Sequence, residues 1–476
     1  RVLIVGAGET GTLLAREMIR HPEAGMKPVG YLDDDSNKRD RTFVGFPVLG
    51  ALDDLPAVVK RRQVDEVLIA MPSASGSVVR KVVDLAQKAD VRYRIIPGIY
   101  EILSEKVSIS QIREVDVEDL LRRAPVQLDM QPIAEYLDDQ VVLVTGAAGT
   151  IGSEIVRQVT RFNPRKLILI DHNENALYMM HLHLQRTYPY LDFLPLVADI
   201  QRPEKLDRIF QRQTPDVIFH AAAHKHVPFM DLNPDEAILN NVFGTRNMLD
   251  MALRYRVERF VNISTDKAVR PSSVMGASKR LAEYLVTQTA SRVNGSRNAF
   301  VSVRFGNVLG SNGSVIPIFK EQIRQGGPVT VTHPDMTRYF MSVPEATQLV
   351  LQAGSFGKNG AIYILDMGDP VRIVDLAYDL IRLSGLEPGE DIPIEFIGKR
   401  PGEKLYEELR YEDEHPDESD HEKILVVRPQ PLPEDFNDHL EALLIAARMS
   451  DPVRIREMLC SMIPAYEAQA EIAYAY

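Results

Sequence analysis

Short apolar runs alternate along this chain with stretches of helical period, and the alternation starts at the first residues. The first runs that predict strands lie at 2–5, 29–32, 66–70 and 92–96. The stretches between them that predict helices lie at 13–19, 53–62 and 77–89. Strands that alternate with helices are typical of a parallel sheet covered by helices. We therefore expect a first α/β domain over residues 1–125.

The same alternation resumes at Val141 and continues to Arg304. The predicted strands lie at 141–144, 167–170, 193–197, 217–220, 260–263 and 300–304. The helices predicted between them include 237–254 and 276–291. This pattern predicts a second α/β domain, whose dinucleotide-binding part spans 141–304.

The remaining segments follow a different pattern. Beyond Arg304 the sequence is irregular and richer in Gly and Pro, which predicts that 305–430 is mainly a substrate lobe within a catalytic domain of 141–430. Residues 126–140 carry Pro132 and several acids, and they predict a linker or an ordered brace. Helical periodicity over 434–468 predicts a helical C-terminal tail within 431–476.

A glycine-rich turn follows the first strand of each domain. The turns read Gly6-Ala-Gly8-Glu-Thr-Gly11 and Gly146-Ala-Ala-Gly149-Thr-Ile-Gly152. Strand, glycine turn and helix together open a dinucleotide-binding α/β unit. We therefore predict two Rossmann-like α/β domains with doubly wound parallel sheets, the second with a smaller C-terminal substrate lobe.

The second turn predicts an NAD site. Its first glycine permits a tight turn, its second lets a pyrophosphate approach the backbone, and its third lets helix and strand pack closely. Asp171 follows Gly152 by 19 residues, where a carboxylate binds ribose hydroxyls and repels a 2′-phosphate, favouring NAD over NADP. The residues assigned to the cofactor are Gly146, Gly149, Thr150, Ile151, Gly152, Asp171, Asp199, Ile200, Ala221, Ala222, Ala223, Asn241 and Lys279.

The first turn is less informative. Asp33 follows the glycines at the sequence distance expected of a carboxylate that binds a ribose. Asp33-Asp34-Asp35 is also consistent with a charged surface turn. No catalytic residues follow it in the first domain. Nucleotide binding and a scaffolding or regulatory role both stay open for this domain.

Composition narrows the class of protein. The 476 residues are enough for two or three domains, and the net charge of −12 argues against nucleic acid or an anionic membrane surface as the main partner. A single cysteine, Cys460, excludes an internal disulfide framework and indicates a reducing compartment. No run of about 18 apolar residues, the length of a membrane-spanning helix, is present in the sequence.

The chain opens at Arg1 inside a strand pattern, from which we expect that an upstream segment has been removed.

Two histidine- and lysine-bearing stretches follow strands of the second domain. His220-Ala-Ala-Ala-His224-Lys-His226 lacks a carboxylate at ligand spacing, so no metal site is predicted there.

Residues 264–279 hold Thr265, Asp266 and Lys267, and later Lys279. A short-chain dehydrogenase would place Tyr four residues before that lysine, where this chain has Met275. An acid and a base side by side, without the tyrosine, indicate chemistry beyond plain hydride transfer.

Six stretches of the second domain together carry a family resemblance: 220–230, 264–271, 275–279, 304–317, 333–341 and 400–404. Through them, residues 141–420 resemble the long, membrane-anchored nucleotide-sugar 4,6-dehydratases of the extended short-chain dehydrogenase family, which act on UDP-N-acetylglucosamine in bacterial capsule, O-antigen and glycan synthesis. Asp231 departs from the family, which often has Glu there. Residues 1–125 resemble the α/β domain that joins the membrane helices to the dehydratase in long members.

The resemblance implies a lyase that uses NAD. The sugar is oxidised at C4, loses water across C5–C6 and is reduced at C6. Asp266 would be the acid for the C6 hydroxyl and Lys267 the base for C5–H, and we expect burial to favour the neutral form of both. Without a tyrosine, the 4-hydroxyl proton passes either to Asp266 through Thr265 or to a water.

The resemblance also supplies the substrate site and the cellular setting. The residues it assigns to the UDP-sugar are Lys225, His226, Asn307, Ser314, Val315, Arg338, Arg400 and Glu403. A guanidinium binds two diphosphate oxygens at once, which suits Arg338 and Arg400. The expected location is the cytoplasmic face of the bacterial inner membrane, with attachment only through an N-terminal segment missing here. A homo-oligomer is left open.

Two other functions compete with the dehydratase. A nucleotide-sugar epimerase shares the fold and cofactor, but it needs a C4 acid–base group, usually the tyrosine, and has no use for Asp266 and Lys267. A non-catalytic, NAD-binding regulatory protein is consistent with the loss of the tyrosine. It predicts that Asp266 and Lys267 are dispensable.

Overall fold

The computed structural model describes residues 1–97, 109–121, 123, 126, 128–293, 295, 298–311, 313–412, 414–429 and 432–466. The chain divides into two compact units. The first comprises Arg1–Val126, Val315–Val329 and Asp375–Ile394, and the second comprises Gln127–Ser314, Thr330–Val374 and Glu395–Tyr476. Two segments of the predicted substrate lobe thus belong to the first unit, where Arg80 forms an ion pair with Asp379 at 2.7 Å.

The first unit contains a parallel sheet with the strand order β2-β1-β5-β6. Successive residues of β1 face opposite sides of the sheet, and both sides are buried: Leu3 and Val5 pack with α2 and α3, and Ile4 packs with α1. The strands are β1 (Val2–Val5), β2 (Pro28–Leu32), β3 (Thr42–Phe43), β4 (Phe46–Pro47), β5 (Glu66–Ile69) and β6 (Arg92–Ile95). The main helices are α1 (Glu9–Arg20), α2 (Leu55–Arg62), α3 (Gly76–Lys88), α4 (Val117–Leu120), α13 (Val315–Arg324) and α15 (Ile373–Leu383).

The second unit is built on a sheet that has nine strands among the described residues, in the order β20-β21-β17-β12-β11-β10-β7-β8-β9. The six strands predicted from the sequence are β7 (Val141–Thr145), β8 (Lys166–Asp171), β9 (Phe193–Val197), β10 (Val217–His220), β11 (Arg259–Ile263) and β12 (Ala299–Arg304). They are parallel, in agreement with the predicted fold class.

The sheet continues into the region predicted to be an irregular lobe. β17 (Ile362–Leu365) pairs parallel with β12, and β21 (Ile424–Val427) and β20 (Asp417–Glu418) complete that edge in antiparallel fashion. The apolar runs Ile-Tyr-Ile-Leu and Ile-Leu-Val-Val are too short to be assigned from periodicity alone. The first run becomes a strand by pairing with the free edge of β12, and the second by pairing in turn with β17.

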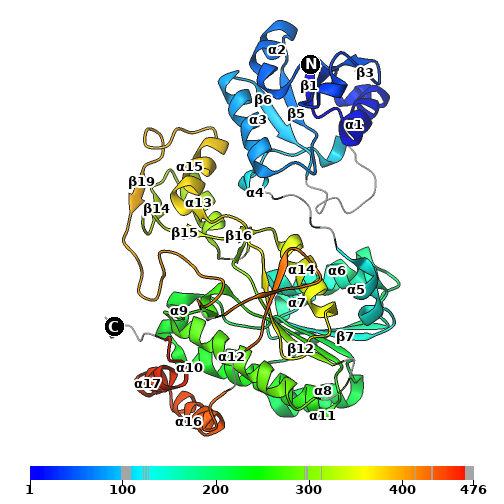
Figure 1. Cartoon of the computed structure of the whole chain (residues 1–476). Helices are drawn as coiled ribbons and strands as arrows, with labels where there is room; N and C mark the ends of the chain where they lie inside the picture. Colours follow the sequence, from blue (N-terminus) through cyan, green and yellow to red (C-terminus); the bar gives the residue numbers. More distant parts are fainter. Residues whose placement is uncertain are drawn as a thin grey trace. The chain divides into compact units, whose positions relative to one another are not determined.

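Helices cover both faces of this sheet (Figure 1). α5 (Met130–Leu137), α6 (Thr150–Val159), α7 (Glu174–Thr187) and α14 (Val343–Ser355) lie on one face, and α8 (Pro203–Gln213), α11 (Thr245–Arg254) and α12 (Val274–Ala290) lie on the other. α5 falls in the predicted linker and is an ordered brace, because Tyr136 Oη donates a 2.8 Å hydrogen bond to Leu351 O of α14. Shorter elements are α9 (Val227–Leu232), α10 (Pro234–Glu236), β13 (Asn307–Val308), β14 (Val329–Val331), β15 (Thr337–Arg338), β16 (Phe340–Met341), β18 (Val371–Arg372) and β19 (Ile394–Phe396).

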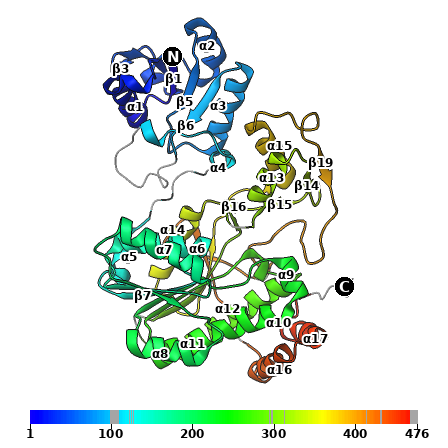
Figure 2. The same ribbon diagram turned by 180° about the vertical axis from the view of Figure 1, so that it is seen from behind.

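The predicted C-terminal helix is two helices. α16 (Phe436–Arg448) and α17 (Pro452–Met462) are separated at Ser450, which has φ +50°. Asp451 caps α17 by accepting from the Arg454 N–H, and Pro452 follows at its first position, where a proline fits. Both helices pack beside α10 (Figures 1 and 2), and 467–468 lie outside the described residues.

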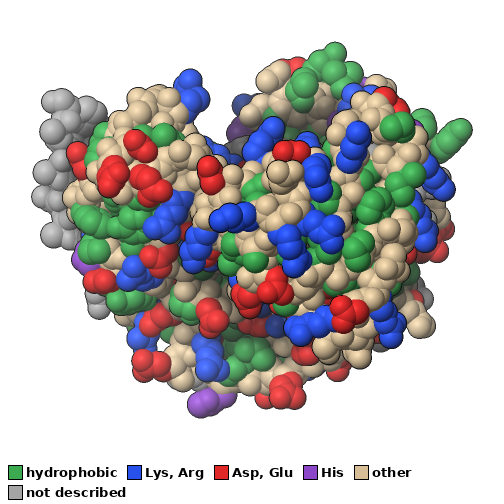
Figure 3. All heavy atoms as spheres, turned by 90° about the horizontal axis from the view of Figure 1, so that it is seen from above, with side chains coloured by type: hydrophobic (Ala, Val, Ile, Leu, Met, Phe, Trp, Pro, Cys, Tyr) green, Lys and Arg blue, Asp and Glu red, His purple; other side chains and the backbone are tan. Residues whose placement is uncertain are grey.

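The surface is charged without strong segregation of sign on the face that Figure 3 shows, where basic and acidic side chains are interspersed. No helix within the described parts of the chain combines the length and apolar character needed to cross a bilayer.

Candidate active site

The glycine turn after β7 is packed so tightly that two positions exclude a side chain. Gly146 has φ +62°, and a Cβ there would lie 2.8 Å from the backbone N of Ala222. A Cβ at Gly152 would lie 2.0 Å from Gly146 O. The turn therefore requires glycine at both positions, and it brings the first residues of α6, Thr150 and Ile151, to the carboxyl end of β7.

A cavity of about 270 Å³ lies at this end of the sheet. It sits where β7 is flanked by β8 and β10, the point at which the strand order reverses and where open α/β sheets bind their ligands. Most of the residues predicted for the cofactor line it together. They are Gly146, Gly149, Asp171, Asp199, Ile200, Ala221, Ala222 and Ala223.

Asp171 is fixed at the edge of this cavity by backbone donors. Its two carboxylate oxygens accept from the N–H groups of Ala148 at 3.0 Å and Asn173 at 2.9 Å. The glycine turn and the carboxylate predicted to bind ribose are thus held together. Their spacing is set by these hydrogen bonds within the fold.

The first unit repeats this arrangement with one difference. Asp33 accepts from the N–H groups of Ala7 at 2.8 Å and Asp35 at 3.0 Å, and Lys38 Nζ also binds it at 2.9 Å. Burial acts to raise the pKa of Asp33, but these donors outweigh burial and lower it. The carboxylate of the first glycine turn is therefore neutralised by a lysine of its own unit.

Asn241, which was also predicted to bind the cofactor, contacts the loop that follows β10 through its side chain. It belongs to η6 (Ala237–Gly244), a π-helical segment that forms the start of the predicted helix 237–254. Its side chain accepts from His224 N at 2.8 Å and donates to His224 O and to Ser278 Oγ, each at 2.9 Å. Asn241 thus anchors the 221–228 loop to α12.

The histidine at the end of β10 is also structural. His220 is buried between Thr145 and Thr245, with ring-nitrogen distances of 2.8 and 2.9 Å to their hydroxyls, and burial lowers its pKa to about 3. No group of three or more His, Cys, Asp or Glu side chains in the described ranges is arranged to hold a metal ion.

A second cavity, of about 220 Å³, lies along the same loop, since residues 221–224 line the first cavity and 225–228 line the second. It gathers seven residues that were predicted to be catalytic or to bind substrate. They are Lys225, His226, Lys267, Asn307, Arg338, Arg400 and Glu403. Ser314 follows Gly313 of the lining, and Asn312 lies outside the described residues. Val315 begins α13 and belongs to the first unit.

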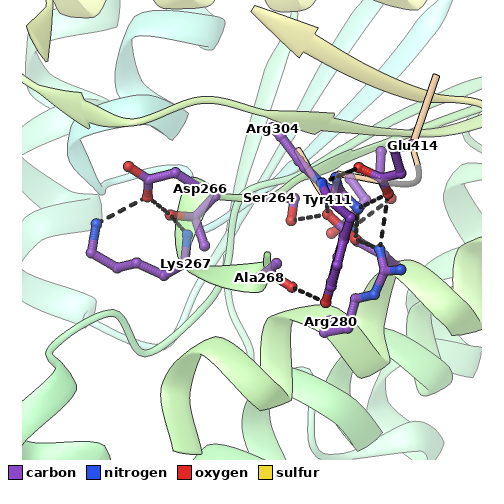
Figure 4. Close-up of polar contacts among 12 residues, drawn as sticks. Ser264, Asp266, Lys267, Ala268, Arg280, Arg304, Tyr411 and Glu414 are labelled. Carbon is purple, nitrogen blue, oxygen red and sulfur yellow. Dashed lines mark hydrogen bonds and ion pairs between the residues drawn. The ribbon is translucent and has the colours of Figure 1, made fainter. Parts of the chain in front are cut away.

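Asp266 and Lys267 begin η7 (Asp266–Ala268), a short turn after β11, and their side chains meet (Figure 4). Lys267 Nζ donates to Asp266 Oδ1 and to Asn307 Oδ1, each at 3.0 Å. Thr265 Oγ1 donates to the same Asp266 oxygen at 2.8 Å. Asp266 is fully buried, whereas 22% of the Lys267 side chain is exposed toward the cavity.

The expectation that burial keeps Lys267 neutral is wrong for this structure. Burial does act to lower the pKa of Lys267, but the carboxylates of Asp266 and Glu407 outweigh it and raise the pKa above its ordinary value. Lys267 is therefore an ammonium before substrate binds. Glu407, which the sequence did not suggest, lies 3.5 Å from Lys267 Nζ in the same cavity.

Met275 and Lys279 lie one turn apart at the start of α12, where Ser273 caps the helix by accepting from Gly276 N. Met275 is 3% exposed and packs in the core on that face of the sheet. Lys279 is also buried, and burial lowers its pKa to about 8. Met275 therefore fills the position at which a short-chain dehydrogenase has its tyrosine, and its apolar side chain cannot exchange a proton.

A buried ion-pair network packs against the turn that holds Asp266 and Lys267 (Figure 4). Arg304, at the end of β12, has no exposed surface, and it binds Glu283 of α12 and Glu414. Glu283 also accepts from Ser264 Oγ at 2.6 Å, two residues before Asp266. Tyr411 Oη donates to Ala268 O at 3.3 Å. Apart from the family resemblance of 304–317, no sequence signal pointed to this network, because its members come from four separate segments.

Comparison with known proteins finds two matching family models and several similar proteins. A family model described as polysaccharide biosynthesis protein matches residues 142–429, and one described as CoA-binding domain matches residues 1–97. The capsular polysaccharide biosynthesis protein CapD of Staphylococcus aureus is 50% identical over 424 residues, covering 89% of this chain and 70% of CapD.

Two further relatives extend the comparison. The probable polysaccharide biosynthesis protein EpsC of Bacillus subtilis is 47% identical over 410 residues, covering 86% of this chain and 68% of EpsC. The crystal structure of Pen from Bacillus thuringiensis is 35% identical, with a TM-score of 0.57, and covers 62% of this chain and 90% of Pen. The chain belongs to the polysaccharide biosynthesis protein family, on an extended short-chain dehydrogenase fold preceded by an α/β domain.

Proposed function

We propose that this protein is an NAD-dependent nucleotide-sugar 4,6-dehydratase that acts on UDP-N-acetylglucosamine for bacterial surface polysaccharide synthesis. The observation that carries the proposal is the contact between Asp266 and Lys267 beside Thr265, at a cavity that shares its loop with the glycine-turn cavity. An acid and a base in contact suit the removal of water from neighbouring carbons.

The residues of the first cavity fit a dinucleotide. Gly146 and Gly152 leave no room for a Cβ, which keeps the turn tight and the start of α6 packed against it, and the Asp171 carboxylate is held at the rim for ribose hydroxyls. Gly149, Thr150 and Ile151 would present the N-terminus of α6, and Lys279 would reach the nicotinamide ribose. NAD, when bound there, supplies the exchange of a hydride with the sugar.

The chain's own residues would handle the protons. The hydrogen bond from Thr265 Oγ1 to Asp266 Oδ1 supports a relay in which Asp266 takes the 4-hydroxyl proton through Thr265. Asp266 would then give that proton to the departing C6 hydroxyl, and Lys267 would take the C5 proton. Positioned proton transfer of this kind contributes about 10²–10⁴-fold in rate.

The second cavity supports a UDP-sugar as the substrate. Arg338 is 6% exposed, and its guanidinium is oriented by the carbonyls of Thr337 and Leu405, while Arg400 is exposed at the rim. Two guanidinium groups suit a diphosphate. Glu403 accepts from Arg400 N at 3.3 Å, and its carboxylate suits the hydroxyls of the uridine ribose.

A mass-spectrometric assay tests the proposal. Incubation of the protein with NAD and UDP-N-acetylglucosamine is expected to give a product lighter by one water. Asp266→Asn should bind the sugar but release little or no dehydrated product. Conversion to an isomer of unchanged mass would identify an epimerase, and unchanged substrate would identify a binding protein; either result would refute the dehydratase.

A further inference from the structure

Glu407 is a second carboxyl group, besides Glu403, in the cavity that Lys267 lines. Glu407 comes from the loop between β19 and β20, and its side chain is 3% exposed. Its Oε1 lies 3.5 Å from Lys267 Nζ and 3.6 Å from Arg338 Nε. Its Oε2 is buried and has no hydrogen-bond partner among the described residues. A buried carboxyl oxygen without a partner, beside a reactive amine, has room to hold a proton.

The groups around Glu407 determine its affinity for a proton. Burial raises its pKa, the negative charge of Asp266 raises it further, and the cations of Lys267, Arg338 and Lys404 partly oppose this. The charged neighbours come from η7, from β15 and from the loop that carries Glu407 itself. Glu407 therefore binds a proton more readily than an exposed glutamate does.

The proposed reaction needs such a group. Lys267 begins as an ammonium, which cannot take the C5 proton. Asp266 is its hydrogen-bonded neighbour, but Asp266 becomes occupied once it has accepted the 4-hydroxyl proton. Among the described residues, the remaining carboxylate that forms an ion pair with Lys267 is Glu407.

We propose that Glu407 accepts a proton from Lys267 after the sugar is oxidised and returns it when the cycle ends; this rests on the dehydratase function proposed above. The first transfer breaks an N–H bond of Lys267 and forms an O–H bond on Glu407, leaving a neutral amine. The amine then takes the C5 proton while Asp266 protonates the C6 oxygen, which leaves as water. Lys267 gives that proton back to C5 as C6 is reduced, and Glu407 then restores the ammonium. No proton enters or leaves the site during the cycle.

The separation of 3.5 Å suits this role. It is an ion-pair distance that a small rotation of either side chain shortens to a hydrogen bond, so the transfer needs no movement of the backbone. Glu407 acts on the sugar only through Lys267, so it is a positioning residue and not a catalytic one.

The test compares Glu407→Gln and Glu407→Asp with Glu408→Gln, an adjacent glutamate that is 42% exposed and pairs with Arg270. At neutral pH, Glu407→Gln should lower kcat for dehydration by about 10²-fold or more with little change in KM, and kcat should recover as the pH rises and solvent removes the Lys267 proton. Glu407→Asp should recover part of the activity, and Glu408→Gln should match the wild type.

A proton count gives a readout that does not depend on turnover. In a single turnover with an indicator dye, Glu407→Gln should release a proton to the medium when the sugar is oxidised, whereas the wild type should release none. If Glu407→Gln kept or exceeded wild-type kcat, Glu407 would only hold Lys267 charged, and the proposal would be overturned. A slow variant without proton release or recovery at high pH would overturn it too. A wild type that forms no dehydrated product would remove the proposed function itself, and this inference with it.

Discussion

The carboxylate of Glu283 stabilises the fold beside the turn that holds Asp266 and Lys267, and the effect of its replacement on stability can be calculated. Glu283 and Arg304 are both fully buried, and two hydrogen bonds of 2.8 and 2.9 Å join them. Glu283→Gln keeps the side-chain volume but removes the charge. It leaves a buried guanidinium with Glu414 as its remaining counter-charge.

Two lines of reasoning agree on the size of the loss. Removing one partner of a buried ion pair typically destabilises a protein by roughly 3–5 kcal/mol. Burial acts to raise the pKa of Glu283, but Arg304 and Arg280 outweigh it and lower the pKa from 4.5 to about 2. That difference between the unfolded and folded protein corresponds to roughly 3 kcal/mol. We expect Glu283→Gln to lower the free energy of unfolding by about this amount at pH 7.

The pH dependence follows from the same lowered pKa. A carboxyl whose pKa is lower in the folded state contributes its full stability above the unfolded value of 4.5 and loses it as the pH falls toward about 2. Urea unfolding followed by circular dichroism suits this chain, which has no tryptophan. The difference between wild type and Glu283→Gln should shrink as the pH falls below 4.5.

The control is a glutamate in an exposed ion pair. Glu457 lies 3.2 Å from Arg454, and both side chains are 58% exposed. Glu457→Gln should change the free energy of unfolding by no more than about 1 kcal/mol, because solvent screens such pairs. If Glu283→Gln were as mild as this control at pH 7, or if its effect did not shrink in acid, the buried charge would not contribute as argued.

Three further predictions concern the proposed cofactor site and proton relay. Gly152→Ala would place a Cβ 2.0 Å from Gly146 O and should abolish NAD binding in calorimetry. Gly357→Ala is the control, because open space surrounds Gly357, and it should leave NAD binding unchanged. Equal NAD affinities of the two variants would contradict the requirement for glycine in the turn. Asp171→Asn should raise the affinity for NADP relative to NAD in a binding titration, because it removes the charge that repels a 2′-phosphate, and an unchanged ratio would contradict that role. Thr265→Val should slow the first oxidation of the sugar by about 10²-fold or more in stopped-flow absorbance, and Thr265→Ser should restore the rate. If Thr265→Val oxidised the sugar at the wild-type rate, a water would be favoured as the acceptor of the 4-hydroxyl proton.

Features that depend on residues close together in the chain could be predicted from the amino-acid sequence. Strands and helices of the second unit follow from local periodicity, and the Gly146 turn follows from glycines at fixed spacing. The contact between Asp266 and Lys267 was also foreseeable, because adjacent residues in a turn can bring their side chains together. These features need no knowledge of what lies across the fold.

Features that depend on residues far apart in the chain became visible only in the folded protein. β17 became a strand because β12 offered it a free edge, and Glu283 and Arg304 could be buried only because each supplies the other's counter-charge. The prediction that burial keeps Lys267 neutral was wrong because it left out the carboxylates that surround the amine in the fold. The pKa of Lys267 is raised by Asp266, its neighbour in the chain, and also by Glu407, which is far away in the chain and 3.5 Å away in the fold. Electrostatic interactions act through space, so a side chain's protonation is set by neighbours that only the folded structure brings together.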